Sequence, residues 1–168
     1  MSLDRPSKIK ILRIICWSIT AAIMIFIFFH SAKNATQSSA QSDPIAKVVY
    51  SIVVPDDTAI TVEQKADIMN SIQLLVRKSA HFLIFAALGF SFFASLTTHF
   101  VGTKKKFILS QIFSSAYAAT DEFHQLFVEG RAGRLSDVLL DSAGAIFGIS
   151  LCFAIIFLIT KIKKGRAI

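Results

Sequence analysis

The fold class is decided by one stretch of the sequence, LSDVLLDSAGAIFGISLCFAIIFLITKIKK, residues 135–164. After Asp141 it carries no charged residue until Lys161, a length sufficient to cross the roughly 30 Å hydrocarbon core of a bilayer as a helix. Asp137 and Asp141 fall in its first turns, and lysines follow its end. The stretch predicts a transmembrane helix over about 135–160 with acidic side chains near one end and cations at the other.

Three further apolar blocks have the same character and cover about residues 11–30, 79–98 and 107–128. The first follows several cations, as a secretory signal would, but it exceeds the length of a signal core, so we expect a retained helix. The third is interrupted by Asp121 to Gln125 and must continue through them to cross. The composition, 54% hydrophobic and 17% charged, is also typical of a chain in lipid. We therefore predict an all-α membrane protein, a single domain over residues 1–168 built as a bundle of four transmembrane helices.

The segment between the first two spans, about residues 31–76, is polar to amphipathic. Its first part, up to Ser42, has the composition of a loop. Asp43 and Pro44 resemble an N-cap and a first helical residue, which predicts a short interfacial helix beginning there. A capping box at 61–64 predicts a further helix that runs into the second span. The apolar stripe of the interfacial helix would be Ile45, Val48, Val49 and Ile52.

Lys and Arg are distributed unequally between the two sides of such a bundle. Four spans place both termini on one side together with the loop around Lys104–Lys106, and most of the 18 Lys and Arg lie there. Because cytoplasmic segments are enriched in Lys and Arg, we expect both termini in the cytoplasm. The segment 31–76 and the turn Gly130–Arg134 then face outward from the cytoplasmic (inner) membrane of a bacterium.

The net charge of +7 has its origin in these membrane-flanking cations. No stretch interleaves basic and aromatic residues as nucleic-acid-binding surfaces do, so we expect no nucleic acid partner. Cys16 and Cys152 both lie in apolar segments and predict neither a disulfide framework nor a Cys-x-x-Cys metal site.

Ionisable side chains within the predicted spans gather at the outward end of three of them. Such residues are costly in a membrane and indicate function by default, although a structural network of buried salt bridges is the alternative. Asp121 and Asp141 would lie about 10 Å below the outer turn, with His81 slightly shallower. Spacings of three and four residues put each set on one helix face, so we expect a polar pocket open to the outside. We predict as candidate catalytic residues His81, Asp121, His124 and Asp141, and as binding residues Arg77, Lys78, Glu122, Gln125, Arg131, Arg134 and Asp137.

These residue types fit several chemistries. Histidine beside a carboxylate can move protons and arginine fits phosphate oxygens, which suits acid–base or phosphoryl work on a lipid head group. The His and Asp side chains could also supply metal ligands, but their spacing matches no His-Glu-x-x-His or other tight signature, so we expect no metal site and name no cofactor. A pocket that binds without turnover stays open, as does proton-coupled transport, for which four spans without a repeat are unusual. The sequence leaves enzyme and binding protein both open.

Four motifs, in this order, resemble the VanZ family. They are Arg77-Lys78-Ser79-Ala80-His81-Phe82, then YAATDEFHQ at 117–125, then Gly130-Arg131, and then Asp137-Val138-Leu139-Leu140-Asp141 followed by Gly144 and Gly148. The chain departs from the family pattern at 29–32, where Phe-His-Ser-Ala stands in place of a Ser-Ser-Gln run, and at Glu129, where the family usually has proline.

The resemblance implies a multi-pass protein of the cell envelope with an outward-facing site. The family is named for a protein linked to low-level resistance to the glycopeptide teicoplanin. We therefore expect a polar pocket that binds or modifies a surface lipid or a cell-wall precursor, with membrane lipids as partners. The alternative is a membrane-embedded hydrolase or phosphotransferase acting on a lipid head group, although the chain lacks the Pro-Ser-Gly-His core of the well-known membrane lipid phosphatases.

Overall fold

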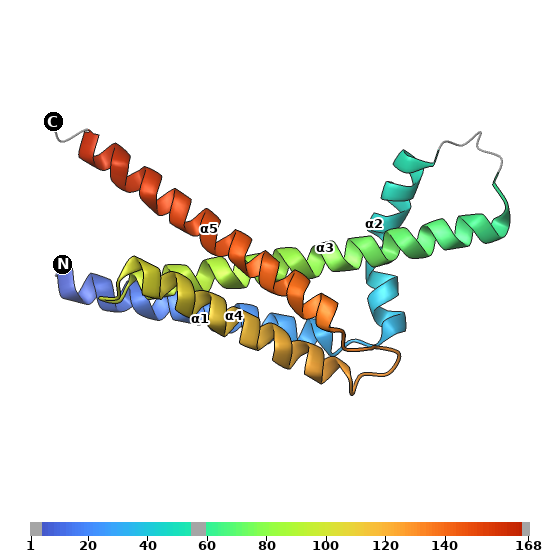
Figure 1. The fold of residues 1–168 in the computed structure, drawn as a ribbon, viewed down its shortest axis with the longest axis horizontal. Helices are drawn as coiled ribbons and strands as arrows, with labels where there is room; N and C mark the ends of the chain where they lie inside the picture. The colour runs from blue at the N-terminus through green and yellow to red at the C-terminus, as the bar shows by residue number, and fades with distance from the viewer. Residues whose placement is uncertain (1–4, 55–59, 166–168) are drawn as a thin grey trace.

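The computed structural model describes residues 5–54 and 60–165, which contain helices and no strand (Figure 1). Three helices are long and apolar enough to cross a membrane, namely Pro6–Ser31, Val62–Thr97 and Leu135–Gly165. The chain is therefore an all-α membrane protein. The five helices are α1 (Arg5–Ser31), α2 (Ala35–Val53), α3 (Val62–Thr97), α4 (Thr103–Gln125) and α5 (Leu135–Gly165).

The remaining long helix, α4, does not reach the apolarity of the other three. Lysines occupy its first turn, serines and Gln111 its middle, and Asp121 and Glu122 its last turns. Length and composition thus identify three of the four spans that the sequence predicts.

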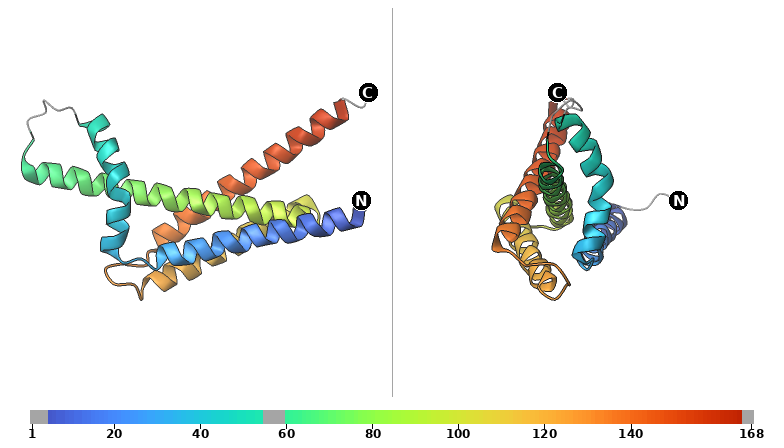
Figure 2. Two further views of the ribbon diagram at one scale, coloured as in Figure 1. Left: turned by 180° about the vertical axis from the view of Figure 1, so that it is seen from behind. Right: turned by 90° about the vertical axis from the view of Figure 1, so that its right-hand side faces the viewer.

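The central helix of the bundle is α3, which contacts each of the other four helices. Figures 1 and 2 show α1 and α4 lying side by side along it, while α5 crosses it at an angle. The two termini and the α3–α4 turn lie at one end of the bundle, and the α1–α2 and α4–α5 connections lie at the other. At the first end, Arg13 of α1 donates to the Thr98 carbonyl (2.9 Å) and Trp17 donates to His99 Nε2 (3.1 Å).

Two glycines of α5 allow the close crossing with α3. A Cβ on Gly148 would lie 1.8 Å from the Ala86 carbonyl oxygen, and one on Gly144 would lie 2.3 Å from that of Phe82. Small residues of this kind let helix backbones approach in membranes. Because Phe82 follows His81 and Gly144 lies one turn after Asp141, the contact also brings the polar ends of the two helices together.

Apolar side chains fill the inside of the bundle and also cover its outside. Ile27, Phe85, Leu88, Phe92 and Ala118 form one buried cluster between α1, α3 and α4. Large apolar side chains on the outer faces stay exposed, which is what contact with lipid requires. Examples with their exposed fractions are Ile14 (66%), Phe29 (66%), Leu83 (61%) and Leu158 (55%).

The helix α2 begins earlier than the sequence predicted. Asn34 is its N-cap and forms a capping box with Gln37, so the expected loop up to Ser42 is mostly helical and Asp43 is not a cap. Pro44 lies within the helix, where it removes one backbone hydrogen bond. Small residues at a spacing of four, Ser38, Ser42 and Ala46, are buried, while the predicted stripe members Ile45, Val48 and Ile52 are exposed.

The prediction for α3 is confirmed. Thr61 is its N-cap and forms the expected capping box with Gln64. The helix then continues for 36 residues, about 54 Å at the rise of an α-helix, so it exceeds the thickness of the hydrocarbon core. Its first turns therefore extend beyond the other long helices and carry α2, as Figure 1 shows.

Candidate functional site

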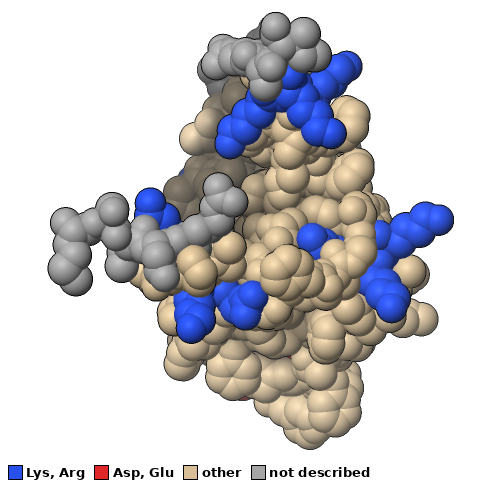
Figure 3. All heavy atoms as spheres, turned by 90° about the vertical axis from the view of Figure 1, so that its left-hand side faces the viewer, with Lys and Arg blue, Asp and Glu red and all other residues tan. Residues whose placement is uncertain are grey.

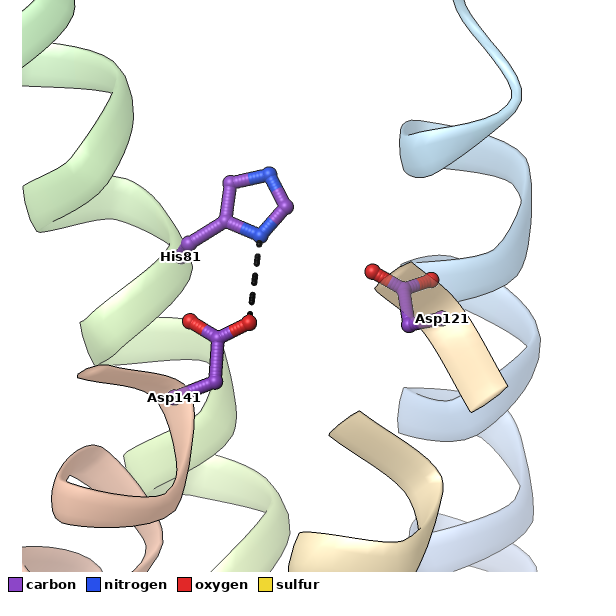
Figure 4. Close-up of side chains that lie close together, drawn as sticks. All are labelled: His81, Asp121 and Asp141. Atoms are coloured by element: carbon purple, nitrogen blue, oxygen red, sulfur yellow. Dashed lines mark ion pairs between the residues drawn. The ribbon is translucent and has the colours of Figure 1, made fainter. Parts of the chain in front are cut away.

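A buried triad of side chains from three helices forms the floor of the site. His81 of α3, Asp121 of α4 and Asp141 of α5 each offer one atom within 4.8 Å of the others. His81 Nδ1 lies 3.7 Å from Asp141 Oδ2, with the two side chains 12% and 1% exposed. Figure 4 shows all three pointing into one shared space. The prediction that these residues share one depth agrees with this geometry.

Asp121 is held in place by two hydrogen bonds that both end on Oδ2. Ser31 Oγ donates from the end of α1 (2.8 Å), and Gln125 Nε2 donates from the next turn of α4 (3.1 Å). Ser31 is completely buried, and the ring of its neighbour His30 lies 5.9 Å from that of His81. Neither residue was predicted as a member of the site. Their position in the sequence could have predicted them, because they end the first apolar block at the depth of Asp121.

Glu122 connects α4 to the following loop. It accepts hydrogen bonds from the Arg134 backbone N–H (2.9 Å) and from Gln125 Nε2 (3.1 Å), and it is 5% exposed. A Cβ on Gly133 would lie 2.4 Å from its carbonyl oxygen, so the loop needs glycine there. Gln125 thus bridges Glu122 and Asp121.

The loop between α4 and α5 places Arg131 over the floor. The helix α4 ends at Gln125, three residues before the predicted end of the span. The chain then turns at Gly130, which has a φ of +71°. Arg131 Nε donates to the Lys33 carbonyl (3.2 Å) and Nη1 donates to Gln125 Oε1 (3.4 Å). Burial, followed by the positive charge of Arg77, lowers the pKa of Arg131 from its ordinary value.

A cavity of about 130 Å³ lies above the floor. His81 and Asp141 reach it from below, and Glu122, Gln125 and Asp137 add polar oxygen and nitrogen atoms to its wall. Lys78 and Asp137 are joined by an ion pair, so that lysine is already neutralised. The cavity brings together every predicted binding residue. Its cations are Arg77, Lys78, Arg131 and Arg134.

Two of the four predicted catalytic residues do not line this cavity. Asp121 belongs to the floor, within 4.8 Å of His81 and Asp141, but it is not part of the cavity lining. His124 is farther away, because its ring stacks on Phe28 of α1 with the centroids 4.8 Å apart. Its Nδ1 atom is buried and has no hydrogen-bond partner among the residues that the structure describes. The three-residue spacing of Asp121 and His124 predicted that both side chains lie on one face of the helix. In the structure His124 points toward α1 instead.

A family model described as VanZ/LLP1 matches residues 16–158, which is most of the chain. The chain belongs to the VanZ family. No curated protein and no solved structure matches it.

The VanZ match contains every residue of the triad and of the cavity wall. Within it, the Gly-Arg motif corresponds to the turn at Gly130 and the cation above the floor. Gly144 and Gly148 of the last motif correspond to the close crossing of α3 and α5. The residues that carry the resemblance to the VanZ family thus include those that assemble one polar site at one end of the bundle.

Proposed function

We propose that the protein crosses the membrane four times, with α4 as the span that hydropathy alone does not identify. α4 has 23 residues and is therefore about 35 Å long, enough to cross. Five of its polar residues are buried inside the bundle, where lipid does not reach them: Ser110, Ser114, Asp121, Glu122 and Gln125. Ile112, Phe113 and Phe123 are exposed on its outer face. This separation is what a lipid-exposed helix with a polar inner face requires.

The distribution of charge supports an orientation with both termini in the cytoplasm. Figure 3 looks at the end of the bundle that carries the termini and shows Lys and Arg gathered there. Cations of this end include Lys8, Lys10, Lys104, Lys105, Lys161 and Lys163. By the positive-inside rule the polar site then opens outward from the bacterial inner membrane. The exposed apolar face of α2 suits a helix at the outer membrane–water boundary.

The cavity suits the anionic head group of a surface lipid or cell-wall precursor. The observation that carries this proposal is the set of cations on its wall, because Lys78 is paired with Asp137 while Arg131 keeps Nη2 buried with no hydrogen-bond partner among the described residues. A guanidinium fork fits the oxygens of a phosphate. At about 130 Å³, the cavity is smaller than the roughly 300–1,000 Å³ of usual ligand sites. It therefore fits a head group, with the apolar remainder of the ligand left in the membrane.

A membrane-embedded hydrolase or phosphotransferase is the second candidate. The contact between His81 and Asp141 favours it, because an imidazole beside a carboxylate can accept and return a proton next to a bound phosphate. Release of inorganic phosphate from a lipid phosphate by the purified protein, abolished in His81→Gln, would support the enzyme. Binding without release would support the binding protein.

The head-group proposal is tested by extraction in native lipid and mass spectrometry of what remains bound. Arg131→Gln removes the unpaired donor, and Lys163→Gln is a matched control that removes a cation at the opposite end. A charge-assisted hydrogen bond contributes about 1.5–3 kcal/mol, so we expect about tenfold or more loss of bound anionic lipid or precursor in Arg131→Gln alone. Equal retention by both variants would refute the proposal. Glycopeptide susceptibility of cells that express the same variants tests the phenotype for which the family is named.

A further inference from the structure

The buried triad lacks something that its chemistry requires. Both oxygens of Asp141 are buried and have no hydrogen-bond partner among the residues the structure describes, and the same holds for His81 Nε2. Native proteins pair buried polar atoms, so unpaired ones of this kind need an explanation such as an ion or a water. The Asp141 side chain is 1% exposed and points toward His81 and Asp121 (Figure 4).

We propose that His81, Asp121 and Asp141 bind one divalent transition metal ion, of the Zn²⁺ or Mn²⁺ type. Ligands about 2.1 Å from a tetrahedral ion lie about 3.4 Å apart. The 3.7 Å between His81 Nδ1 and Asp141 Oδ2 is close to that separation, and all three ligand atoms lie within 4.8 Å of one another. Small side-chain rotations therefore bring the three onto one ion.

The donor set selects this class of metal. One imidazole nitrogen and two carboxylate oxygens suit Zn²⁺ or Mn²⁺, whereas Ca²⁺ takes six to eight oxygens and Mg²⁺ keeps several waters. Two carboxylates also balance the charge of a divalent ion, which lowers the cost of burying all three groups. The nearby cation Lys78 is already paired with Asp137.

The surroundings of the triad fit a metal site with supported ligands. Ser31 and Gln125 hold Asp121 by bonds to Oδ2, and partners of this kind orient metal ligands. Three protein ligands leave at least one coordination position open, as in catalytic zinc sites. His81 and Asp141 line the cavity, so that position faces it. An anionic oxygen could occupy it, a step that rests on the proposed function, whereas the metal site rests on the triad alone.

No short sequence motif indicates this site, because its three ligands come from three different helices. Our expectation of no metal site followed from spacing along the chain. The inference from the structure reverses that expectation.

The test uses the full chain in detergent, stripped with a chelator and titrated with Zn²⁺, Mn²⁺ or Mg²⁺ alone, without any lipid ligand. Elemental analysis should find one Zn²⁺ or Mn²⁺ per chain. Asp141→Asn and Asp121→Asn should each weaken binding about tenfold or more. Asp67→Asn is the matched control, because it makes the same change at an exposed aspartate of α3 outside the triad and the cavity, and it should bind as the wild type does. Absence of binding by the wild type, or wild-type affinity in Asp141→Asn, would overturn the proposal.

A second measurement removes the dependence on folded variants. Mn²⁺ bound to the wild type should show coupling to a nitrogen nucleus in pulsed electron paramagnetic resonance, because His81 supplies a ligand. Bound Mn²⁺ without that coupling would refute the assignment. Failure to bind head groups with the metal site intact would count against the proposed function only.

Discussion

Asp141→Asn distinguishes a carboxylate kept for function from one kept for stability. In the structure Asp141 is 1% exposed, and neither oxygen has a hydrogen-bond partner among the described residues. Its ion pair is the 3.7 Å contact with His81. A buried polar group without a partner costs about 1–3 kcal/mol, and more when charged. We expect the free energy of unfolding of metal-free Asp141→Asn to equal that of the metal-free wild type or to exceed it by about 1 kcal/mol.

If Asp141 instead belongs to a structural salt bridge, Asp141→Asn should lower the free energy of unfolding. Removing one partner of a buried salt bridge costs about 3–5 kcal/mol. For a chain of this size each kcal/mol corresponds to about 2–4 °C, so the alternative predicts a melting temperature lower by roughly 6–20 °C. Fluorescence of Trp17, the single tryptophan, reports unfolding because the ring packs edge-on against Phe92 within the bundle.

Asp121→Ala is the comparison within the same triad. It leaves Ser31 and Gln125 without their common acceptor, at about 1–3 kcal/mol for each unsatisfied buried donor. We therefore expect Asp121→Ala to melt several degrees below the wild type while Asp141→Asn does not. If Asp141→Asn melts as low as Asp121→Ala, the triad is a structural network and the reasoning is wrong.

Three further predictions concern helix packing, the α1–α4 contact and α2. Gly148→Leu should lower the free energy of unfolding by at least about 1–3 kcal/mol, because even a Cβ there meets the α3 backbone at 1.8 Å; an unchanged melting temperature would contradict the crossing. Ser31→Ala should lower it by about 1 kcal/mol through the lost bond to Asp121, and equal melting would contradict that bond. The hydrogen bond from Lys47 lowers the pKa of Asp43, so its support of α2 is present above the ordinary carboxyl pKa and is lost as pH falls through the lowered one; an ordinary pKa in a carboxyl NMR titration would contradict the contact.

Much of the site was predictable because helix geometry is regular. A rise of about 1.5 Å per residue placed Asp121, Asp141 and His81 at one depth, and the structure brings these three together. The predicted binding residues on α3, α4 and α5 line one cavity for the same reason, whereas Arg131 and Arg134 reach it from the α4–α5 loop. Which way a side chain turns at that depth depends on packing between helices. His124 shows this, because its stacking on Phe28 is a contact that spacing along α4 does not reveal.

The remaining differences arise where local patterns compete. Asp43 and Pro44 form a good helix start in isolation. The capping box at Asn34 instead starts α2 earlier in the chain, at Ala35, and the helix continues through Pro44. The sequence predicted a loop from Ser31 onward. In the structure Ser31 is the last residue of α1, and its hydroxyl donates to Asp121. Partners that are distant in sequence decide such cases, and composition does not encode them.

The central claim is that α4 spans the membrane and that the polar site opens to the outside. Two exposed positions on either side of α4 test it directly: Ala132, in the loop on the cavity wall, and Thr103, at the start of α4. Each is replaced by cysteine in a chain whose Cys16 and Cys152 are serine, and intact cells are treated with a membrane-impermeant maleimide. We predict that Ala132→Cys is labelled and that Thr103→Cys is labelled only after the cells are opened. Labelling of both in intact cells would show that α4 does not cross, and labelling of Thr103→Cys alone would show that the site faces the cytoplasm.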